Sequence, residues 1–152
     1  MQYKGKHLTA DMYGCSFEVL NDLDFIKDAI IKAVKEANMT LLEISHHEFE
    51  ESKGLTAMAL LSESHLSIHT NPSVGYAAID VFTLSQTSDP NKAVLVLKRL
   101  LKPDKMKTTQ ITRGDFRLQK DMKPRAKVSS TTMRKVKNTS AKVLNFLGRK
   151  SR

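Results

Sequence analysis

The side chains best suited to chemistry are concentrated in one short segment, residues 62–70, which reads Ser-Glu-Ser-His-Leu-Ser-Ile-His-Thr. Serine hydroxyls lie there beside the imidazoles of His65 and His69. An imidazole titrates near neutral pH and accepts a proton from a neighbouring hydroxyl, which turns serine into a nucleophile. Three interpretations of this segment compete.

The first interpretation is a Ser-His-Asp hydrolase built from Ser64, His69 and Asp80. The sequence around Ser64 is Glu63-Ser64-His65. It lacks the glycines of the G-x-S-x-G elbow, which the sharp strand-to-helix turn of that motif requires. A second interpretation assigns the segment no chemistry, with its polar side chains capping the ends of strands in a hairpin. The residues alone favour this second interpretation.

A metal site is the third interpretation, because His46, His47, His65 and His69 lie close together in the sequence. His65 and His69 are four residues apart and would share one face of a strand. Their separation along it would be roughly 13 Å, which is too far for both to bind one ion. No carboxylate pattern completes a ligand set, so the sequence predicts no metal.

Two helices are expected around this segment. Apolar residues recur at spacings of three and four over Leu23–Ala37, and Asp22 precedes this helix. Asp89 is a natural N-cap for the second helix, with Pro90 at its first position and Lys102-Pro103 at its end. Alternating apolar runs predict strands at 2–13, 40–49, 55–62, 66–70, 76–83 and 106–112.

This order of elements, β-α-β-β-β-β-α-β, favours an α+β fold. We expect a two-layer sandwich with a mainly antiparallel sheet and two helices on one face. Ser64 and His69 are five residues apart, so in a regular strand they would point to opposite faces. Their cooperation requires a bend near 64–66 or delivery of one side chain from elsewhere. We expect Glu63-Ser64-His65 to lie in a tight turn.

Charge divides the chain into two parts. Residues 1–100 carry 9 Lys and Arg against 13 Asp and Glu, whereas residues 101–152 carry 16 against 3. We therefore expect one acidic globular domain over 1–115 and a basic tail over 116–152. The tail is expected to be flexible or to fold as a helix on a partner, and its charge suits nucleic acid or another anionic surface.

Composition excludes several classes of protein. No apolar run approaches the roughly 18 residues of a membrane span, and the opening residues lack the apolar core of a secretory signal. Cys15 is the single cysteine, which excludes an intramolecular disulfide and a cysteine-based zinc cluster. These features predict a cytoplasmic protein.

Residues 60–83 closely resemble the self-cleaving segment of S-adenosylmethionine decarboxylases of the short prokaryotic type. The shared patterns are S-E-S-H at 62–65, I-H-T at 68–70 and G-Y-A-A-I-D-V-F-T at 75–83. The openings of the first strand and of the second helix match as well. These matches are Gly5-x-His7-Leu8, Tyr13-x-Cys15 and Asp89-Pro90-x-Lys92-Ala93. The resemblance covers about residues 3–115.

The resemblance implies a proenzyme. Ser64 would attack the carbonyl of Glu63 and form an ester, and β-elimination would cut the chain between them. The new N-terminus would be a pyruvoyl group, with His69 as the processing base. This covalent cofactor would form a Schiff base with the amine of S-adenosylmethionine and accept electrons as carbon dioxide leaves. The product would be the aminopropyl donor for spermidine synthesis.

Further implications concern binding and assembly. Phe49 matches an aromatic that stacks on adenine, and Thr56 stands near a hydroxyl position of the family. Family members pair processed protomers and build their active sites at the interface, so a homo-oligomer is expected.

Three residues depart from the family pattern: Leu84 replaces a proton-donating cysteine, Asn71 an adenine-stacking tryptophan, and Ser73 a ribose-binding glutamate. Two alternatives therefore stay open. One is a pyruvoyl-dependent decarboxylase of ornithine or arginine. The other is a non-catalytic homologue that binds a partner through its basic tail.

Overall fold

The structure is a computed structural model, and it describes residues 4–114. Short connections join nine helices and strands and one 3-10 turn within this range. In chain order the elements are β1 (Gly5–Tyr13), α1 (Phe17–Leu20), α2 (Leu23–Glu36), β2 (Leu41–Glu48), β3 (Leu55–Leu61), β4 (Ser64–Asn71), η1 (Pro72–Val74), β5 (Tyr76–Thr83), α3 (Pro90–Leu101) and β6 (Lys105–Arg113).

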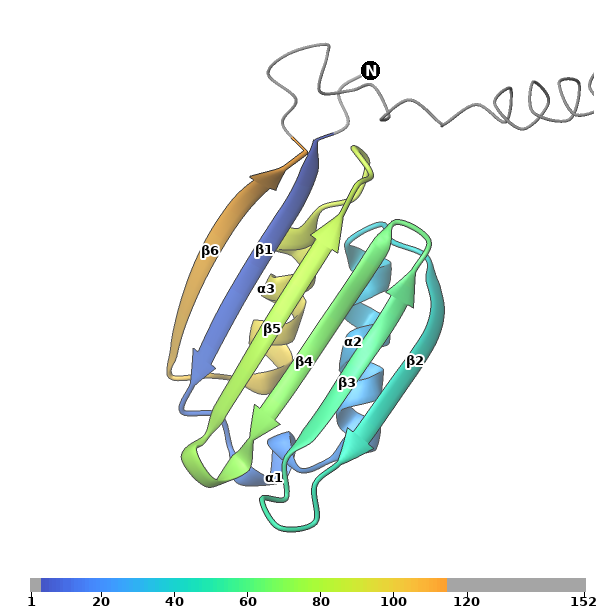
Figure 1. Cartoon of the computed structure of the whole chain (residues 1–152). Helices are drawn as coiled ribbons and strands as arrows, with labels where there is room; N and C mark the ends of the chain where they lie inside the picture. Colours follow the sequence, from blue (N-terminus) through green and yellow to red (C-terminus); the bar gives the residue numbers. More distant parts are fainter. Residues whose placement is uncertain (1–3, 115–152) are drawn as a thin grey trace, which may run out of the picture. The chain divides into compact units, whose positions relative to one another are not determined.

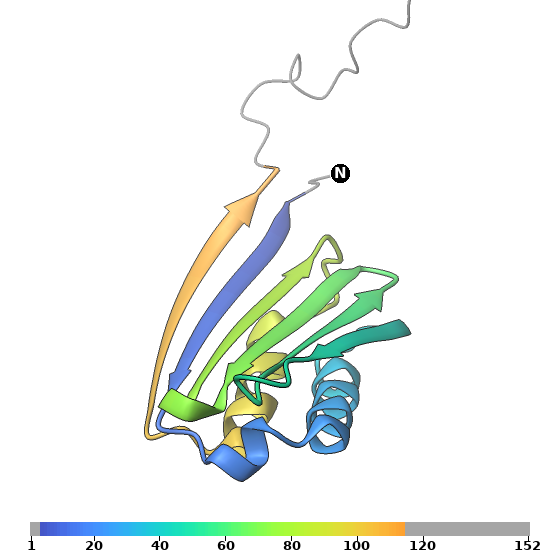
Figure 2. The same cartoon turned by 60° about the horizontal axis from the view of Figure 1, so that its bottom comes forward.

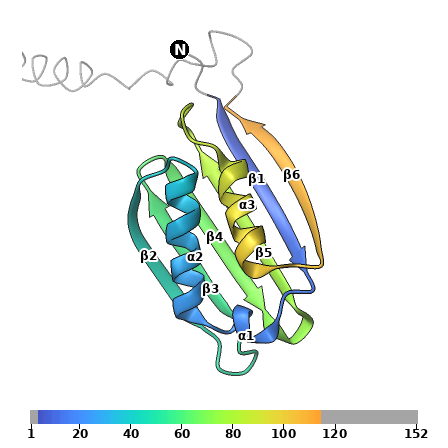
Figure 3. The same cartoon turned by 180° about the vertical axis from the view of Figure 1, so that it is seen from behind.

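The strands form one sheet in the order β2-β3-β4-β5-β1-β6, and every neighbouring pair is antiparallel (Figure 1). Helices α2 and α3 cover one face of this sheet, and no helix of residues 4–114 covers the other face (Figures 2 and 3). The expected α+β two-layer sandwich is therefore confirmed. We call the sheet surface opposite α2 and α3 the bare face.

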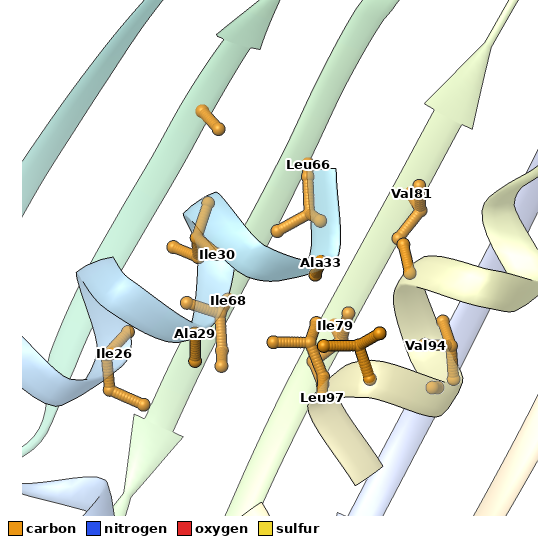
Figure 4. Packing of buried hydrophobic residues seen from close by; sticks show 14 of the residues in the cluster. Ile26, Ala29, Ile30, Ala33, Leu66, Ile68, Ile79, Val81, Val94 and Leu97 are labelled. Carbon is orange, nitrogen blue, oxygen red and sulfur yellow. The ribbon is translucent and has the colours of Figure 1, made fainter. Parts of the chain in front are cut away.

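The hydrophobic core lies between the helices and the sheet (Figure 4). Alternate residues of β4 and β5 point into it and meet apolar side chains of α2 and α3. The fully buried members at this contact include Leu66, Ile68, Ile79, Val81, Ile26, Ile30 and Leu97. Burial of each large apolar side chain stabilises the fold by about 1.5–3 kcal/mol. A one-residue slip of β4 would expose this face, so burial fixes its register and the position of Ser64.

The helices begin where their polar caps predict. The Asp22 carboxylate accepts a hydrogen bond from the Phe25 backbone N–H at 2.9 Å, and Asp89 accepts one from the Asn91 N–H at 3.0 Å. Pro90 opens α3, where a missing N–H breaks no helical bond. These contacts confirm both predicted helix starts.

Three local features differ from the sequence prediction. Helix α1 and turn η1 have no counterpart in it, and β4 begins at Ser64 rather than at Leu66. The expected tight turn over residues 63–65 is correct only for Glu63, because the turn consists of Ser62 and Glu63. Ser64 pairs with Leu61 on one side and Thr83 on the other, so strand pairing continues up to the turn.

No helix within residues 4–114 is long and apolar enough to cross a membrane. The predicted basic tail, 116–152, lies outside the described residues.

Candidate active site

The Glu63–Ser64 peptide bond lies where the turn between β3 and β4 ends. The backbone N–H of Leu84 donates a hydrogen bond to the Glu63 carbonyl oxygen at 3.1 Å. Nucleophilic attack on a carbonyl carbon puts negative charge on its oxygen, and a fixed N–H donor stabilises that charge. The first residue after β5 thus holds the carbonyl that a Ser64 nucleophile would attack.

The imidazole beside Ser64 is that of His65. Ser64 Oγ lies 3.4 Å from His65 Nδ1, a long hydrogen bond, and both residues are partly buried. The His65 ring packs at a tilt against Phe82, with 5.8 Å between ring centroids. His65 is therefore held next to the serine by its position on β4 and by an aromatic neighbour on β5.

His69 occupies a different place, near the far end of β4. Its Nδ1 lies 2.9 Å from Thr56 Oγ1, its register partner on β3. Five strand residues span roughly 16 Å, so Ser64 and His69 of one chain lie far apart. Ser64 occupies the register position of the buried residues Leu61 and Thr83, and its hydroxyl turns toward His65. The structure joins His69 to Thr56 and separates both from Ser64.

Asp80 does not complete a hydrolase triad. One carboxylate oxygen lies 3.3 Å from His7 Nε2, so its imidazole partner is on β1. His69 is bound instead to Thr56. Among residues 4–114, no group of three or more His, Cys, Asp or Glu side chains is arranged to hold a metal ion.

Phe49 follows β2 and leaves 46% of its surface exposed. Its ring meets that of His47 edge-on, at 4.8 Å between centroids and 76° between planes. His47 is the register partner of Thr56, which bonds His69. A connected row of side chains therefore runs onto the bare face, and it consists of Phe49, His47, Thr56 and His69.

A hollow of about 470 Å³ opens beside Phe49, and it is large enough for a small metabolite. Its other lining residues are His47, Glu48, Glu50, Glu51 and Ser52. Sequence reasoning considered His47 only as a metal ligand and missed its place beside Phe49. The available signal was its position two residues before Phe49, which puts the pair on one side of an extended chain.

A second polar cluster lies on the bare face where β5 begins. The Tyr76 hydroxyl donates a short hydrogen bond to the Asp11 carboxylate, and the Tyr13 ring lies 5.4 Å away. This hydrogen bond, together with partial burial and the negative charge of Asp11, raises the pKa of Tyr76 to about 12. Loss of the phenolic proton would place two negative charges side by side.

This cluster makes a pH-dependent prediction. The contact favours protonated Tyr76, so its stabilising effect is present below pH 10 and is lost as pH rises from 10 to about 12. Asp11→Asn should lower the pKa of Tyr76 toward 10. Ultraviolet titration of phenolate absorbance measures this, with Tyr76→Phe identifying the signal. An unshifted pKa in the folded wild-type chain would contradict the proposed contact.

The three departures from the family pattern lie at the two ends of β4. Leu84 is at the Glu63 end, where its backbone N–H donates to the Glu63 carbonyl. Its side chain is 58% exposed and offers no acidic proton. Asn71 ends β4, and Ser73 lies in η1, where both are exposed. Their side chains offer hydrogen-bond donors and acceptors but neither an aromatic ring nor a carboxylate.

The fold and the site define the class of protein: a two-layer α+β domain whose candidate site residues lie on and beside an antiparallel sheet that helices cover on one face. The family model for S-adenosylmethionine decarboxylase matches residues 6–114. This match spans most of the chain, and the chain belongs to the S-adenosylmethionine decarboxylase family.

Individual relatives agree with this assignment. An S-adenosylmethionine decarboxylase proenzyme of Moorella thermoacetica is 40% identical over 114 residues, which cover 75% of this chain and 90% of the relative. The S-adenosylmethionine decarboxylase proenzyme of Methanococcus maripaludis is also 40% identical, over 75% of this chain and 93% of the relative. The crystal structure of the adenosylmethionine decarboxylase from Aquifex aeolicus superposes with a TM-score of 0.69 at 32% sequence identity. The superposition covers 75% of this chain and 93% of the Aquifex aeolicus chain.

Proposed function

We propose that this chain is a proenzyme that cuts itself between Glu63 and Ser64 and then decarboxylates S-adenosylmethionine. The product is the aminopropyl donor for spermidine biosynthesis. The observation that carries the proposal is the junction itself, where a serine follows a carbonyl held by the Leu84 N–H. Relatives matched over nine-tenths or more of their own length are named as proenzymes of this activity.

Self-cleavage needs only groups that the chain supplies and water. Ser64 Oγ bonds to the Glu63 carbonyl carbon, the C–N bond breaks, and the amide nitrogen takes a proton as the ester forms. A base then removes the Cα proton of Ser64, and the Cβ–O bond breaks with release of the Glu63 carboxylate. This elimination leaves a dehydroalanine with a free amino group, which takes a proton at Cβ and becomes an imine. Hydrolysis of the imine by water releases ammonia and leaves a ketone. This pyruvoyl ketone supplies the electron sink that decarboxylation of an amine substrate requires.

His69 is the proposed base, and Thr56 orients its ring through the 2.9 Å hydrogen bond. The roughly 16 Å between Ser64 and His69 along β4 requires that the acting His69 come from a second copy of the chain. Apolar side chains on the bare face suit such pairing, since Met58, Leu60 and Ile111 are each about half exposed. We therefore propose a homo-oligomer in which bare faces meet.

For the substrate, we propose that Phe49 stacks on the adenine ring and Thr56 lies in the same site. The hollow beside Phe49 also favours a second candidate, because Glu48, Glu50 and Glu51 line it. Carboxylates attract the cationic side chain of ornithine or arginine. Asn71 and Ser73, at the same end of the sheet as this hollow, lack groups specific for a nucleoside.

The deciding experiment measures carbon dioxide released from carboxyl-labelled S-adenosylmethionine, ornithine and arginine by the purified full chain. We expect release from S-adenosylmethionine, and we expect Phe49→Ala to raise its KM about tenfold with a smaller change in kcat, since one aromatic stacking contact is lost. A matched Phe17→Ala variant, at an exposed phenylalanine of α1, should leave both constants unchanged.

Release only from ornithine or arginine would select the second candidate. Cleaved chain that releases carbon dioxide from none of the three would leave the non-catalytic homologue. A cytoplasmic location, and binding of the basic tail 116–152 to nucleic acid or another anionic surface, stay predictions of the sequence.

A further inference from the structure

The Glu63 side chain makes a contact that the cleavage chemistry does not itself require. Its carboxylate accepts two hydrogen bonds from Thr40, one from the backbone N–H at 2.9 Å and one from the hydroxyl at 3.1 Å. The Ser62 N–H donates to the Thr40 carbonyl at 3.0 Å. Thr40 lies in the link between α2 and β2, at the same end of the domain as the β3–β4 turn (Figure 1). We call this set of three hydrogen bonds the Thr40 clamp.

We propose that Glu63 is a positioning residue for self-cleavage, which through the Thr40 clamp holds the carbonyl attacked by Ser64. This inference rests on the proposed self-processing function. It concerns the first step, in which the Ser64 hydroxyl adds to the Glu63 carbonyl carbon.

The hairpin itself does not depend on the clamp. Leu61 and Ser64 already pair across the two-residue turn, and both flanking strands are held by buried residues. A glutamate in such a turn is ordinarily solvated and free to rotate. Here two donors fix both of its oxygens, and hydrogen bonds to a charged acceptor are stronger than neutral ones.

The charge state of Glu63 agrees with this geometry. Burial alone would raise the pKa of its carboxyl group, but hydrogen bonds, first among them the one from the Thr40 backbone, outweigh that effect and lower it. The carboxylate is therefore ionised, with both oxygens accepting, throughout the neutral pH range.

The clamp and Leu84 act on residue 63 from two sides. Leu84 holds the backbone oxygen of Glu63, and Thr40 holds its side chain. Together they restrict rotation of the scissile peptide relative to the Ser64 hydroxyl. Reaction rates rise steeply when a nucleophile and its target are held in a reactive arrangement, so loss of the clamp should slow ester formation.

The same bonds act after the cut. Thr40 and Glu63 both belong to the 1–63 fragment, so the clamp retains the new C-terminus at the end of β3. This end then cannot swing across the ketone formed at residue 64.

The test follows cleavage of the newly synthesised full chain by denaturing mass spectrometry. We expect Glu63→Ala to slow cleavage at least tenfold and Thr40→Val to slow it several-fold, because valine keeps the backbone N–H but loses the hydroxyl. Thr40→Ser keeps both donors and should restore the wild-type rate. Glu36→Ala removes an exposed glutamate from the end of α2 and should have no effect.

Two further measurements separate positioning from folding. Thermal unfolding of each variant on a Ser64→Ala background reports stability without cleavage, and we expect midpoints close to that of the parent. Hydroxylamine cleaves esters, so it should release no additional fragment from Glu63→Ala if ester formation is the slowed step. Accumulated ester would overturn the inference, as would wild-type cleavage rates in both Glu63→Ala and Thr40→Val.

If Glu63→Ala fails to fold, the cleavage rates of Thr40→Val and Thr40→Ser test the positioning role of the Thr40 clamp. Equal rates in that pair count against the clamp, and slower cleavage by the valine variant supports it. Failure of the wild-type chain to cleave would instead remove the proposed function on which the inference rests.

Discussion

Replacing Ser64 by alanine is expected to abolish self-cleavage. The wild-type chain should separate on denaturation into fragments 1–63 and 64–152, whereas Ser64→Ala should give one polypeptide of the full 17.1 kDa. The reason is chemical, since alanine has neither the hydroxyl that attacks Glu63 nor an oxygen that can leave from Cβ. The change removes one partly buried hydroxyl, whose polar partner among residues 4–114 is His65, so the fold should survive.

Intact mass under denaturing conditions measures this directly. Ser67→Ala is the matched control, because Ser67 lies on the same strand and is 5% exposed, yet it is three residues from the junction. We expect it to cleave like the wild type. An uncut wild-type chain, or a Ser64→Ala chain cut at residue 63, would remove the serine-based mechanism altogether.

The second large effect is expected from mixing two inactive variants. Ser64→Ala lacks the nucleophile and His69→Ala lacks the proposed base, so neither should be cleaved when expressed alone. In a mixed oligomer, however, Ser64 of the His69→Ala chain would meet His69 of the Ser64→Ala chain. Random pairing in a two-fold dimer gives about half of the His69→Ala chains such a partner, and these should be cleaved.

Co-expression with two different affinity tags tests this arrangement. Sequential purification on both tags isolates mixed oligomers, and mass spectrometry identifies which chain is cut. Cleavage confined to the His69→Ala chain is the expected result. Co-purified chains that both remain intact would place the acting histidine within its own chain or remove it from the reaction, and separate elution of the tags would contradict the oligomer.

Much of the fold could be predicted from local patterns. Asp22, Asp89 and Pro90 mark helix starts because capping depends on residues within one turn of each other. Alternation of apolar residues marks the strands and their buried face for the same local reason. Prediction failed at the start of β4, because Ser64 and His65 are drawn into the sheet by Thr83 and Phe82, which lie far along the chain.

For the site, the sequence alone determined which chemical groups are available: a serine, the carbonyl before it, histidines at 65 and 69, and an aromatic ring at 49. The chemistry of these groups is present in any conformation. Only the tertiary structure decided their neighbours, since strand register joins residues distant in sequence. It paired His69 with Thr56, brought Leu84 N–H and Thr40 to Glu63, and set His69 far from Ser64 on one strand. Register depends on which faces are buried against α2 and α3, and that burial is a property of the assembled domain.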